Sequence, residues 1–165
     1  MLPEKNSLSW HCLSNQENDY AVYYNIPYCK TPCSFCHYIP NIKLRYSSVP
    51  SSYIQMLIKQ TRDVLAYAIP YRHAVSCYIG GGTPSLLNPE QLNSLFQVMD
   101  EYIKGFDEVC IEIHPSDWNA EYIDLGRITR FSLGIQTFNQ QRLGRVIIQV
   151  RRMTEAAQYI APKKL

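Results

Sequence analysis

Long apolar runs are missing from this sequence of 165 residues, and none approaches the roughly 20 residues that a membrane-spanning helix needs. The N-terminal residues lack the apolar core of a secretory signal, which favours the cytoplasm and its reducing conditions. Net charge is low, at +2, and no block of lysine and arginine indicates a nucleic-acid partner. What remains is the composition of an ordinary globular domain, with 46% hydrophobic and 18% charged residues.

Apolar strands alternate with amphipathic helices after a polar, flexible N-terminal segment, residues 1–19. The strands are short apolar runs rich in β-branched and aromatic residues, predicted at 20–26, 74–79, 108–113 and 130–136. Helices are predicted after Ser51 or Ser52 and as far as Ala68, from 89 onwards, at 119–125 and over the remainder of the chain. This alternation, with strands that are nearly continuously apolar, is typical of a parallel sheet in an α/β fold.

Two of the predicted helices have recognisable starts. Ser51 or Ser52 can cap the first. Asn88 precedes a proline at the first helical position and Gln91 at the third, which is the arrangement of a capping box. The core-facing stripes of the two helices are predicted to be Ile54, Leu57, Ile58, Leu65 and Ala68, and Leu92, Leu95, Phe96 and Met99.

Each unusual motif lies at the carboxyl end of a predicted strand. Cysteines 29–36 follow the first strand and the glycines 80–82 follow the second. Glu112 lies near the end of the third strand, and Gln136 closes the fourth. Parallel α/β folds collect their ligands at this edge of the sheet. The convergence of four motifs there predicts a single site and favours an enzyme.

Three of the six cysteines lie within eight residues, as Cys29, Cys33 and Cys36. The spacing C-x3-C-x2-C suits a [4Fe-4S] cluster, which normally takes one thiolate per iron. A chain that offers three thiolates leaves one iron open, and open metal positions are where chemistry occurs. The cysteine segment therefore favours a catalytic metal centre over a structural one.

Zinc is the main alternative for these cysteines, although His37 directly follows Cys36 and no second C-x2-C lies nearby. The other histidines could complete a zinc site only by folding back: His11, His73 and His114. Disulfide bonds are a further alternative, which a reducing compartment disfavours. The other cysteines are predicted to be ligand-free, two as buried small hydrophobes and one in the flexible segment: Cys77, Cys110 and Cys12.

The sequence resembles a known family at these cysteines and at four later motifs. YYNIPYCKTPCSFC at 23–36 is similar to the cluster segment of radical S-adenosylmethionine (SAM) enzymes. GGGTPSLL at 80–87, E-x-x-P at 112–115, RFSLGIQTFN at 130–139 and LGR at 143–145 follow in the order of one branch of that superfamily. This branch contains oxygen-independent coproporphyrinogen III oxidase and the related heme chaperone.

The resemblance implies a partial (β/α) TIM-like barrel over residues 20–165, with a [4Fe-4S] cluster on Cys29, Cys33 and Cys36. SAM would chelate the open iron and be split by an electron to a 5′-deoxyadenosyl radical. The implied activity is that of a radical SAM oxidoreductase similar to coproporphyrinogen dehydrogenase, in porphyrin and heme biosynthesis. The implied partners are a small-molecule substrate, a tetrapyrrole, and an electron donor such as flavodoxin or ferredoxin.

The same resemblance implies the residues that contact SAM. Gly80 and its two successors would let the backbone approach the methionyl group closely, and Glu112 would accept hydrogen bonds from the ribose hydroxyls or the amino group. The full set of implied contacts is Tyr23, Phe35, Gly81, Gly82, Thr83, Glu112, Gln136 and Arg145.

The sequence departs from the family in three places. Tyr38 stands where the oxidase has an additional cysteine, and LGR follows about three residues too early. Residues 146–165 do not resemble the family, so we expect a chain truncated after about four βα units, without the substrate-binding C-terminal domain. Truncation can abolish activity. The alternatives are a non-catalytic heme chaperone-like or Fe–S binding protein, and a radical SAM methyltransferase.

Overall fold

The computed structural model describes residues 20–30, 33, 36, 46–68 and 74–135. Its centre is one sheet of four parallel strands, β1 (Tyr20–Ile26), β2 (Ala74–Gly81), β3 (Phe106–Ile113) and β4 (Arg130–Leu133), in the order β1-β2-β3-β4. The helices are α1 (Ser51–Ala68), α2 (Pro89–Asp100) and the short α3 (Glu121–Asp124), with 3₁₀ turns η2 (Pro84–Leu86) and η3 (Pro115–Asp117). The predicted flexible segment 1–19 and the C-terminal helix lie outside the described residues.

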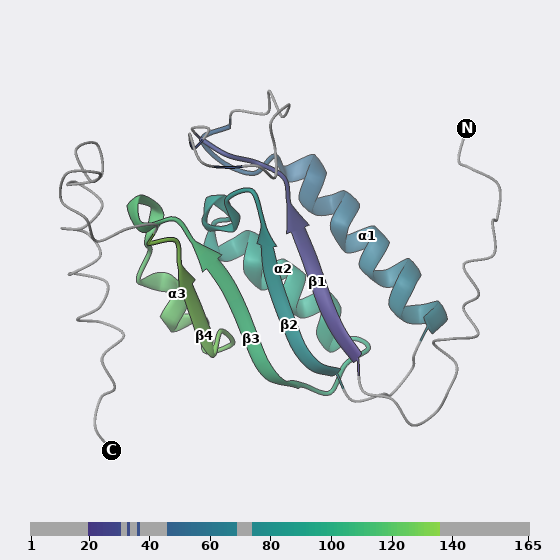
Figure 1. The fold of residues 1–165 in the computed structure, drawn as a ribbon. Helices are drawn as coiled ribbons and strands as arrows, with labels where there is room; N and C mark the ends of the chain where they lie inside the picture. The colour runs from purple at the N-terminus through teal and green to yellow at the C-terminus, as the bar shows by residue number, and fades with distance from the viewer. Residues whose placement is uncertain (1–19, 31–32, 34–35, 37–45, 69–73, 136–165) are drawn as a thin grey trace, which may run out of the picture.

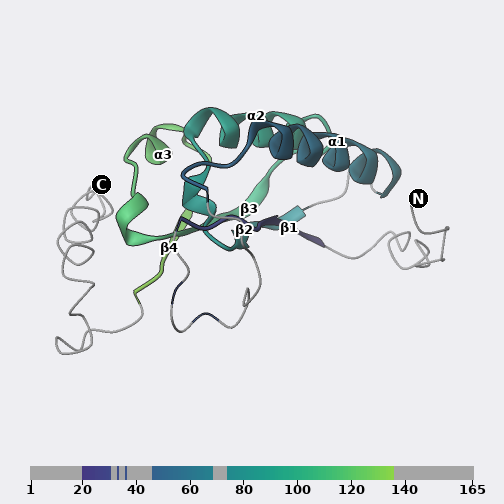
Figure 2. The ribbon, with the colours of Figure 1, turned by 90° about the horizontal axis from the view of Figure 1, so that it is seen from above.

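The strands are neighbours in space in the same order as in sequence, and the helices all lie on one face of the sheet (Figures 1 and 2). Right-handed crossovers between parallel strands produce this one-sided arrangement when the strand order never reverses. A doubly wound sheet would instead reverse its order and carry helices on both faces. The described residues therefore have the layout of one segment of a β/α barrel.

The core lies between the sheet and helices α1 and α2. Ile26 of β1, Ile79 of β2 and Ile111 of β3 are fully buried, as are Leu95 and Phe96 of α2. Burial of each such side chain contributes about 1.5–3 kcal/mol to folding. Cys77 and Cys110 are also fully buried, so the prediction that both pack as small hydrophobes is confirmed.

The two predicted helix starts have different outcomes. The capping box of α2 is confirmed. The backbone amide of Gln91 donates to Asn88 Oδ1 at 2.8 Å, and the backbone amide of Asn88 donates to Gln91 Oε1 at 3.1 Å. The serine cap of α1 is wrong. The carbonyl of Pro50 already accepts from the amide of Ile54 at 3.3 Å, which places both serines inside the first turn.

Strand β4 ends earlier than predicted, at Leu133 rather than at residue 136. The Gly134 amide still donates to the carbonyl of Ile113 in the neighbouring strand at 3.0 Å. The Ile135 amide, however, donates to the carbonyl of Leu133 in its own strand at 2.8 Å. This tight turn takes the backbone out of the extended conformation. Gln136, predicted to close the strand, lies outside the described residues.

Helix α3 is shorter than the predicted 119–125. The Asn119 side chain accepts from the Glu121 amide at 2.9 Å and forms a turn ahead of the helix. Gly126, with φ of 63°, lies two residues after the last helical residue, where a left-handed residue commonly ends a helix. Among the described helices, none combines the length and the apolar character that crossing a membrane requires.

The capping box gives a testable prediction for stability. Replacing Asn88 with alanine removes the bond to the third amide of α2 and should lower the free energy of unfolding by about 1 kcal/mol. The matched control is Asn93→Ala, an exposed position inside the same helix, where alanine is the better helix former. Urea denaturation of both variants tests this, and equal stability of the two would contradict it.

Candidate functional site

The carboxyl ends of β1 and β2 are joined by a hydrogen bond from the Gly82 amide to the carbonyl of Ile26, at 2.8 Å. The cysteine segment leaves β1 at this point, and the glycine turn leaves β2 (Figure 1). The predicted convergence of these two motifs at one rim of the sheet is therefore present in the structure.

The glycine turn has no room for side chains. A Cβ at Gly82 would lie 2.7 Å from the carbonyl oxygen of Tyr28 and 2.9 Å from Cys29 Sγ. Gly81 has φ of +116°, and a Cβ there would collide with the Asn25 side chain. Both glycines are thus required by contacts within the chain, in addition to any role in approaching a ligand.

The three cysteines of the segment after β1 lie close enough together that two of them affect the pKa of the third. Cys29 and Cys33 are half-buried and Cys36 is exposed. The pKa of the Cys33 thiol is raised by burial first, and then by the neighbouring thiols of Cys36 and Cys29. Within the described ranges, no three His, Cys, Asp or Glu side chains are arranged as a metal site.

The alternative zinc ligands are placed only in part. His114 is the one histidine within the described residues, and its Nδ1 lies 2.7 Å from Ser116 Oγ at the start of η3. The other histidines, and the predicted SAM contacts Phe35, Gln136 and Arg145, lie outside the described residues.

The sheet face opposite the helices, here called the helix-free face, carries the other predicted site residues. The rings of Tyr23 and Tyr78 stack with centroids 5.8 Å apart and an interplanar angle of 11°. The Tyr78 hydroxyl donates to Glu112 Oε1 at 2.7 Å. A Cβ at Gly80 would lie 2.7 Å from Tyr23 Oη, so this glycine makes room for the tyrosine pair.

Tyr78 is a site residue that the sequence reasoning missed. A tyrosine inside an apolar strand is usually interpreted as a core aromatic. Side chains alternate along a strand, however, so Tyr78 lies on the same face of the sheet as Gly80, the helix-free face. Burial, and then the hydrogen bond to Glu112, raise the pKa of Tyr78 to about 12, so its hydroxyl is a neutral donor at physiological pH. Tyr23 is 60% exposed and extends the aromatic surface.

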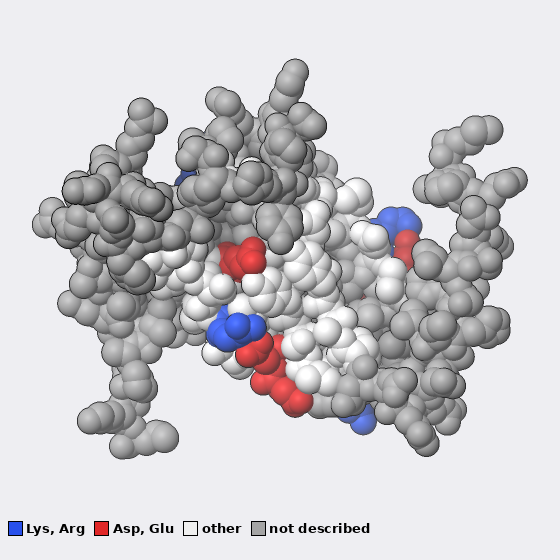
Figure 3. All heavy atoms as spheres, viewed as in Figure 1, with Lys and Arg blue, Asp and Glu red and all other residues white. Residues whose placement is uncertain are grey.

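On the helix-free face, the part of the surface that the structure describes carries acidic side chains above and below a basic one (Figure 3). The Arg130 guanidinium lies 6.0 Å from the centroid of the Tyr78 ring and pairs with Glu108 at 2.8 Å. Thr83, another predicted SAM contact, lies between the glycine turn and η2, where its carbonyl accepts from the Leu86 amide at 3.1 Å. The glycines, Thr83 and Glu112 therefore lie along the ends of β2 and β3, and Tyr23 lies in the middle of β1.

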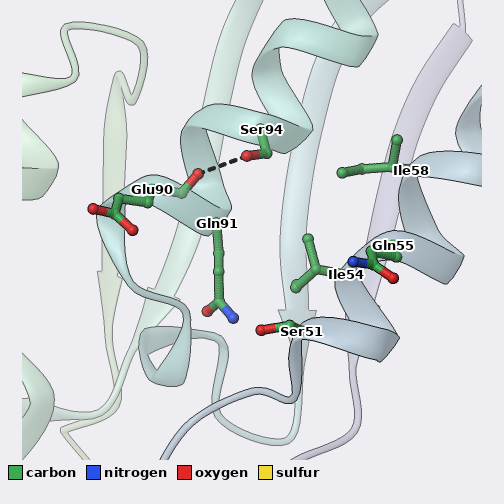
Figure 4. A pocket seen from close by; sticks show the side chains of 7 residues that line it. All are labelled: Ser51, Ile54, Gln55, Ile58, Glu90, Gln91 and Ser94. Carbon is green, nitrogen blue, oxygen red and sulfur yellow. Dashed lines mark hydrogen bonds between the residues drawn. The ribbon is translucent and has the colours of Figure 1, made fainter.

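Two surface cavities flank the sheet. One of about 240 Å³ lies between α1 and α2, lined by Ile54, Gln91 and their neighbours (Figure 4), on the helix side and away from the motifs. The other, of about 310 Å³, lies at the rim and is lined by polar residues such as Lys30 and Asp117 and by apolar ones such as Leu87 and Trp118. Only the second adjoins the cysteine segment.

Comparisons with known proteins agree with the motifs. No family model matches the chain. The heme chaperone HemW of Haemophilus influenzae is 34% identical over 139 residues, which are 76% of this chain and 36% of the relative. The oxygen-independent coproporphyrinogen III oxidase of Salmonella typhimurium is 29% identical over 130 residues, 76% of this chain and 28% of the relative.

Among solved structures, coproporphyrinogen III oxidase (HemN) from Escherichia coli, a radical SAM enzyme, matches with a TM-score of 0.74. It is 23% identical and the match covers 91% of this chain and 36% of that one. The predicted partial TIM-like barrel is thereby confirmed. The chain is homologous to heme chaperones and to the oxidase, and it spans about a third of the length of these relatives.

The crowding at Gly82 gives a second testable prediction. Gly82→Ala should destabilise the fold by about 1–3 kcal/mol, because the added methyl group must displace Tyr28 or Cys29. The control is Gly105→Ala, where a Cβ meets nothing within 4 Å and the backbone is not left-handed. Thermal or urea unfolding measures both. A Gly82→Ala variant as stable as the Gly105→Ala variant would show that the turn is loosely packed.

The Tyr78 phenol gives a prediction for pH dependence. Because its pKa is raised from 10.0 to about 12 on folding, its contribution to stability is complete below pH 10 and is lost as the pH rises towards 12. The ring-carbon NMR signals of labelled Tyr78, assigned with Tyr78→Phe, should not move before pH 11. Glu112→Gln should lower the pKa while leaving it above 10, because burial is the larger cause. Titration near pH 10 in the folded wild type would contradict this.

Proposed function

We propose that this homologue of heme chaperones and coproporphyrinogen oxidases is a radical SAM protein that binds a [4Fe-4S] cluster and SAM at the rim of its sheet. The observation that carries the proposal is the contact between two motifs of different strands. The glycine turn after β2 packs against Cys29 so closely that a methyl group at Gly82 would lie 2.9 Å from Cys29 Sγ.

The donor set fits an iron–sulfur cluster. Cys29, Cys33 and Cys36 are thiols, which are the usual ligands of such clusters, and the backbone amide of Cys36 donates to the carbonyl of Cys33 at 3.1 Å. Three protein ligands leave one iron for an exogenous ligand. When bound, the cluster and SAM supply an electron transfer that generates a 5′-deoxyadenosyl radical for hydrogen abstraction.

The chain's own residues bind and orient. Oε1 of Glu112 accepts a hydrogen bond from the Tyr78 hydroxyl, which holds the carboxylate in place. Its Oε2 is then left to accept hydrogen bonds from hydroxyl or ammonium groups of SAM. Tyr23 offers an exposed ring beside it for apolar contact. Gly81, Gly82 and Thr83 form the backbone turn beside the cysteines, and we assign Phe35, Gln136 and Arg145 to the same ligand from the motifs that contain them.

The reaction we propose is an oxidoreductase step on a tetrapyrrole, with the electron supplied by a small flavin or iron–sulfur protein. Its support is the oxidase among the relatives and the solved oxidase that shares the fold. The matched region is only about a third of those proteins, so substrate recognition belongs to the proposal rather than to the geometry described.

Anaerobic reconstitution with iron and sulfide tests the proposed function. The protein should take up four irons per chain, gain an absorbance shoulder that dithionite bleaches, and release 5′-deoxyadenosine from SAM. Cys29→Ser, Cys33→Ser and Cys36→Ser should each lose most of the iron, whereas Cys12→Ser, the same change outside the motif, should not. Zinc as the bound metal, or iron uptake that does not depend on these three cysteines, would refute the cluster assignment.

Heme binding without SAM cleavage is the second candidate function. It is favoured by the heme chaperones among the relatives, with identity reaching 34%. The same preparations separate the two candidates. Stoichiometric heme uptake in an absorbance titration, with no 5′-deoxyadenosine formed, would favour the carrier, and deoxyadenosine without heme uptake would favour the enzyme.

A further inference from the structure

Lys30 stands between two of the proposed ligands, directly after Cys29 and three residues before Cys33. Its ammonium donates a charge-assisted hydrogen bond to Oδ1 of Asp117, a residue 87 positions later in the chain. Asp117 belongs to η3, the turn that follows β3. This ion pair therefore connects the cysteine segment after β1 with the end of β3.

The two partners differ sharply in their exposure. The Asp117 side chain is 6% exposed, whereas the Lys30 side chain is 47% exposed. A carboxylate withdrawn from water needs a cation or several hydrogen bonds, because its desolvation is otherwise uncompensated. The other groups near this carboxylate are weak partners, the Ser116 hydroxyl at 3.4 Å and the His114 ring nitrogen at 3.9 Å.

Asp117 is itself firmly held. Its amide donates to the carbonyl of His114 at 2.8 Å, and the His114 amide donates to Ser85 Oγ at 3.0 Å. Ser85 lies in η2, and its carbonyl accepts from the hydroxyl of the buried Tyr122 at 3.0 Å. These bonds tie the turns after β2 and β3 into one polar unit, to which Lys30 attaches the turn after β1.

Another lysine–aspartate pair in the same protein shows what an ordinary surface contact looks like. Lys59 and Asp63 are paired at 2.7 Å within α1, with side chains 77% and 63% exposed. Exposed pairs of this kind contribute little, because water screens both charges. The Lys30–Asp117 pair differs in that one partner is buried and the residues it joins are distant in sequence.

We propose that Lys30 and Asp117 are positioning residues, an ion pair that anchors the start of the cysteine segment so that Cys29 is presented at the rim together with Cys33. The proposal deepens the cluster-binding function and rests on it for its consequence. The anchoring itself is a property of the chain without any cofactor.

The double variant Lys30→Met/Asp117→Asn tests the anchor without leaving a charge buried. It removes both charges, so the fold should be retained, as thermal unfolding would verify. In the cofactor-free protein, alkylation of Cys29 and Cys33 followed by mass spectrometry should become about tenfold faster, which corresponds to about 1.4 kcal/mol. Cys77 and Cys110, both fully buried, serve as internal references, and Lys59→Met/Asp63→Asn is the matched control.

Two single variants separate anchoring from a direct effect of the lysine charge on the thiols. Asp117→Asn keeps the lysine charge but removes its partner, so an anchoring role predicts faster alkylation, as in the double variant. Lys30→Arg should preserve the wild-type rate, because arginine can pair with the same carboxylate. Wild-type alkylation rates in the double variant would overturn the proposal. So would an Asp117→Asn variant whose alkylation rates are not raised as in the double variant.

Release of iron from the reconstituted protein to a chelator provides the cofactor-dependent measurement. The double variant should lose iron about tenfold faster than the wild type and the Lys59→Met/Asp63→Asn control do. This is the same ratio as expected for the alkylation rates of Cys29 and Cys33. Failure of the wild type to bind iron would refute the proposed function alone, since the alkylation rates would still test the anchor. Iron bound and released equally by all variants would refute the positioning role.

Discussion

The close approach of β1 and β2 at their carboxyl ends is the constraint on which the site depends. The Gly82 amide bonds to the carbonyl of Ile26 at 2.8 Å, and no side chain fits between this turn and the cysteine segment. Parallel pairing of the two strands brings their ends together, and glycine allows the backbones to meet. The first thiol is consequently fixed against a turn from another strand, which a flexible loop of cysteines could not achieve.

Two distinct surfaces meet along this rim. On the helix-free face, the stacked Tyr23 and Tyr78 lead to Glu112, and the Arg130–Glu108 pair lies beside the Tyr78 ring. On the outer side, Lys30 and Asp117 belong to a network of hydroxyl, amide and charged groups. An aromatic surface suits a ligand with flat and apolar parts, whereas a polar network suits the orientation of the chain itself. The rim thus separates an aromatic side from a polar side.

The sequence predicted the four strands well, because each contains a short run rich in β-branched and aromatic residues, which is typical of strands. It also predicted the α2 start, where Asn88 and Gln91 depend only on each other. It did not predict the start of α1 or the end of β4, where backbone bonds of Pro50 and Ile135 decide the outcome. The side-chain partners of Tyr78 and Lys30 were not predictable from local pattern, since they are 34 and 87 residues away.

The uninterrupted order of the strands has a consequence for how such a sheet can grow. Each new βα unit is laid beside the previous one, and within the described residues β4 pairs on one side, with β3. A strand added at the β4 edge would lengthen the same curved wall and leave the junction of β1 and β2 untouched. Extension of the sheet and preservation of the cysteine junction are therefore independent in this architecture, because they occur at opposite edges of one sheet.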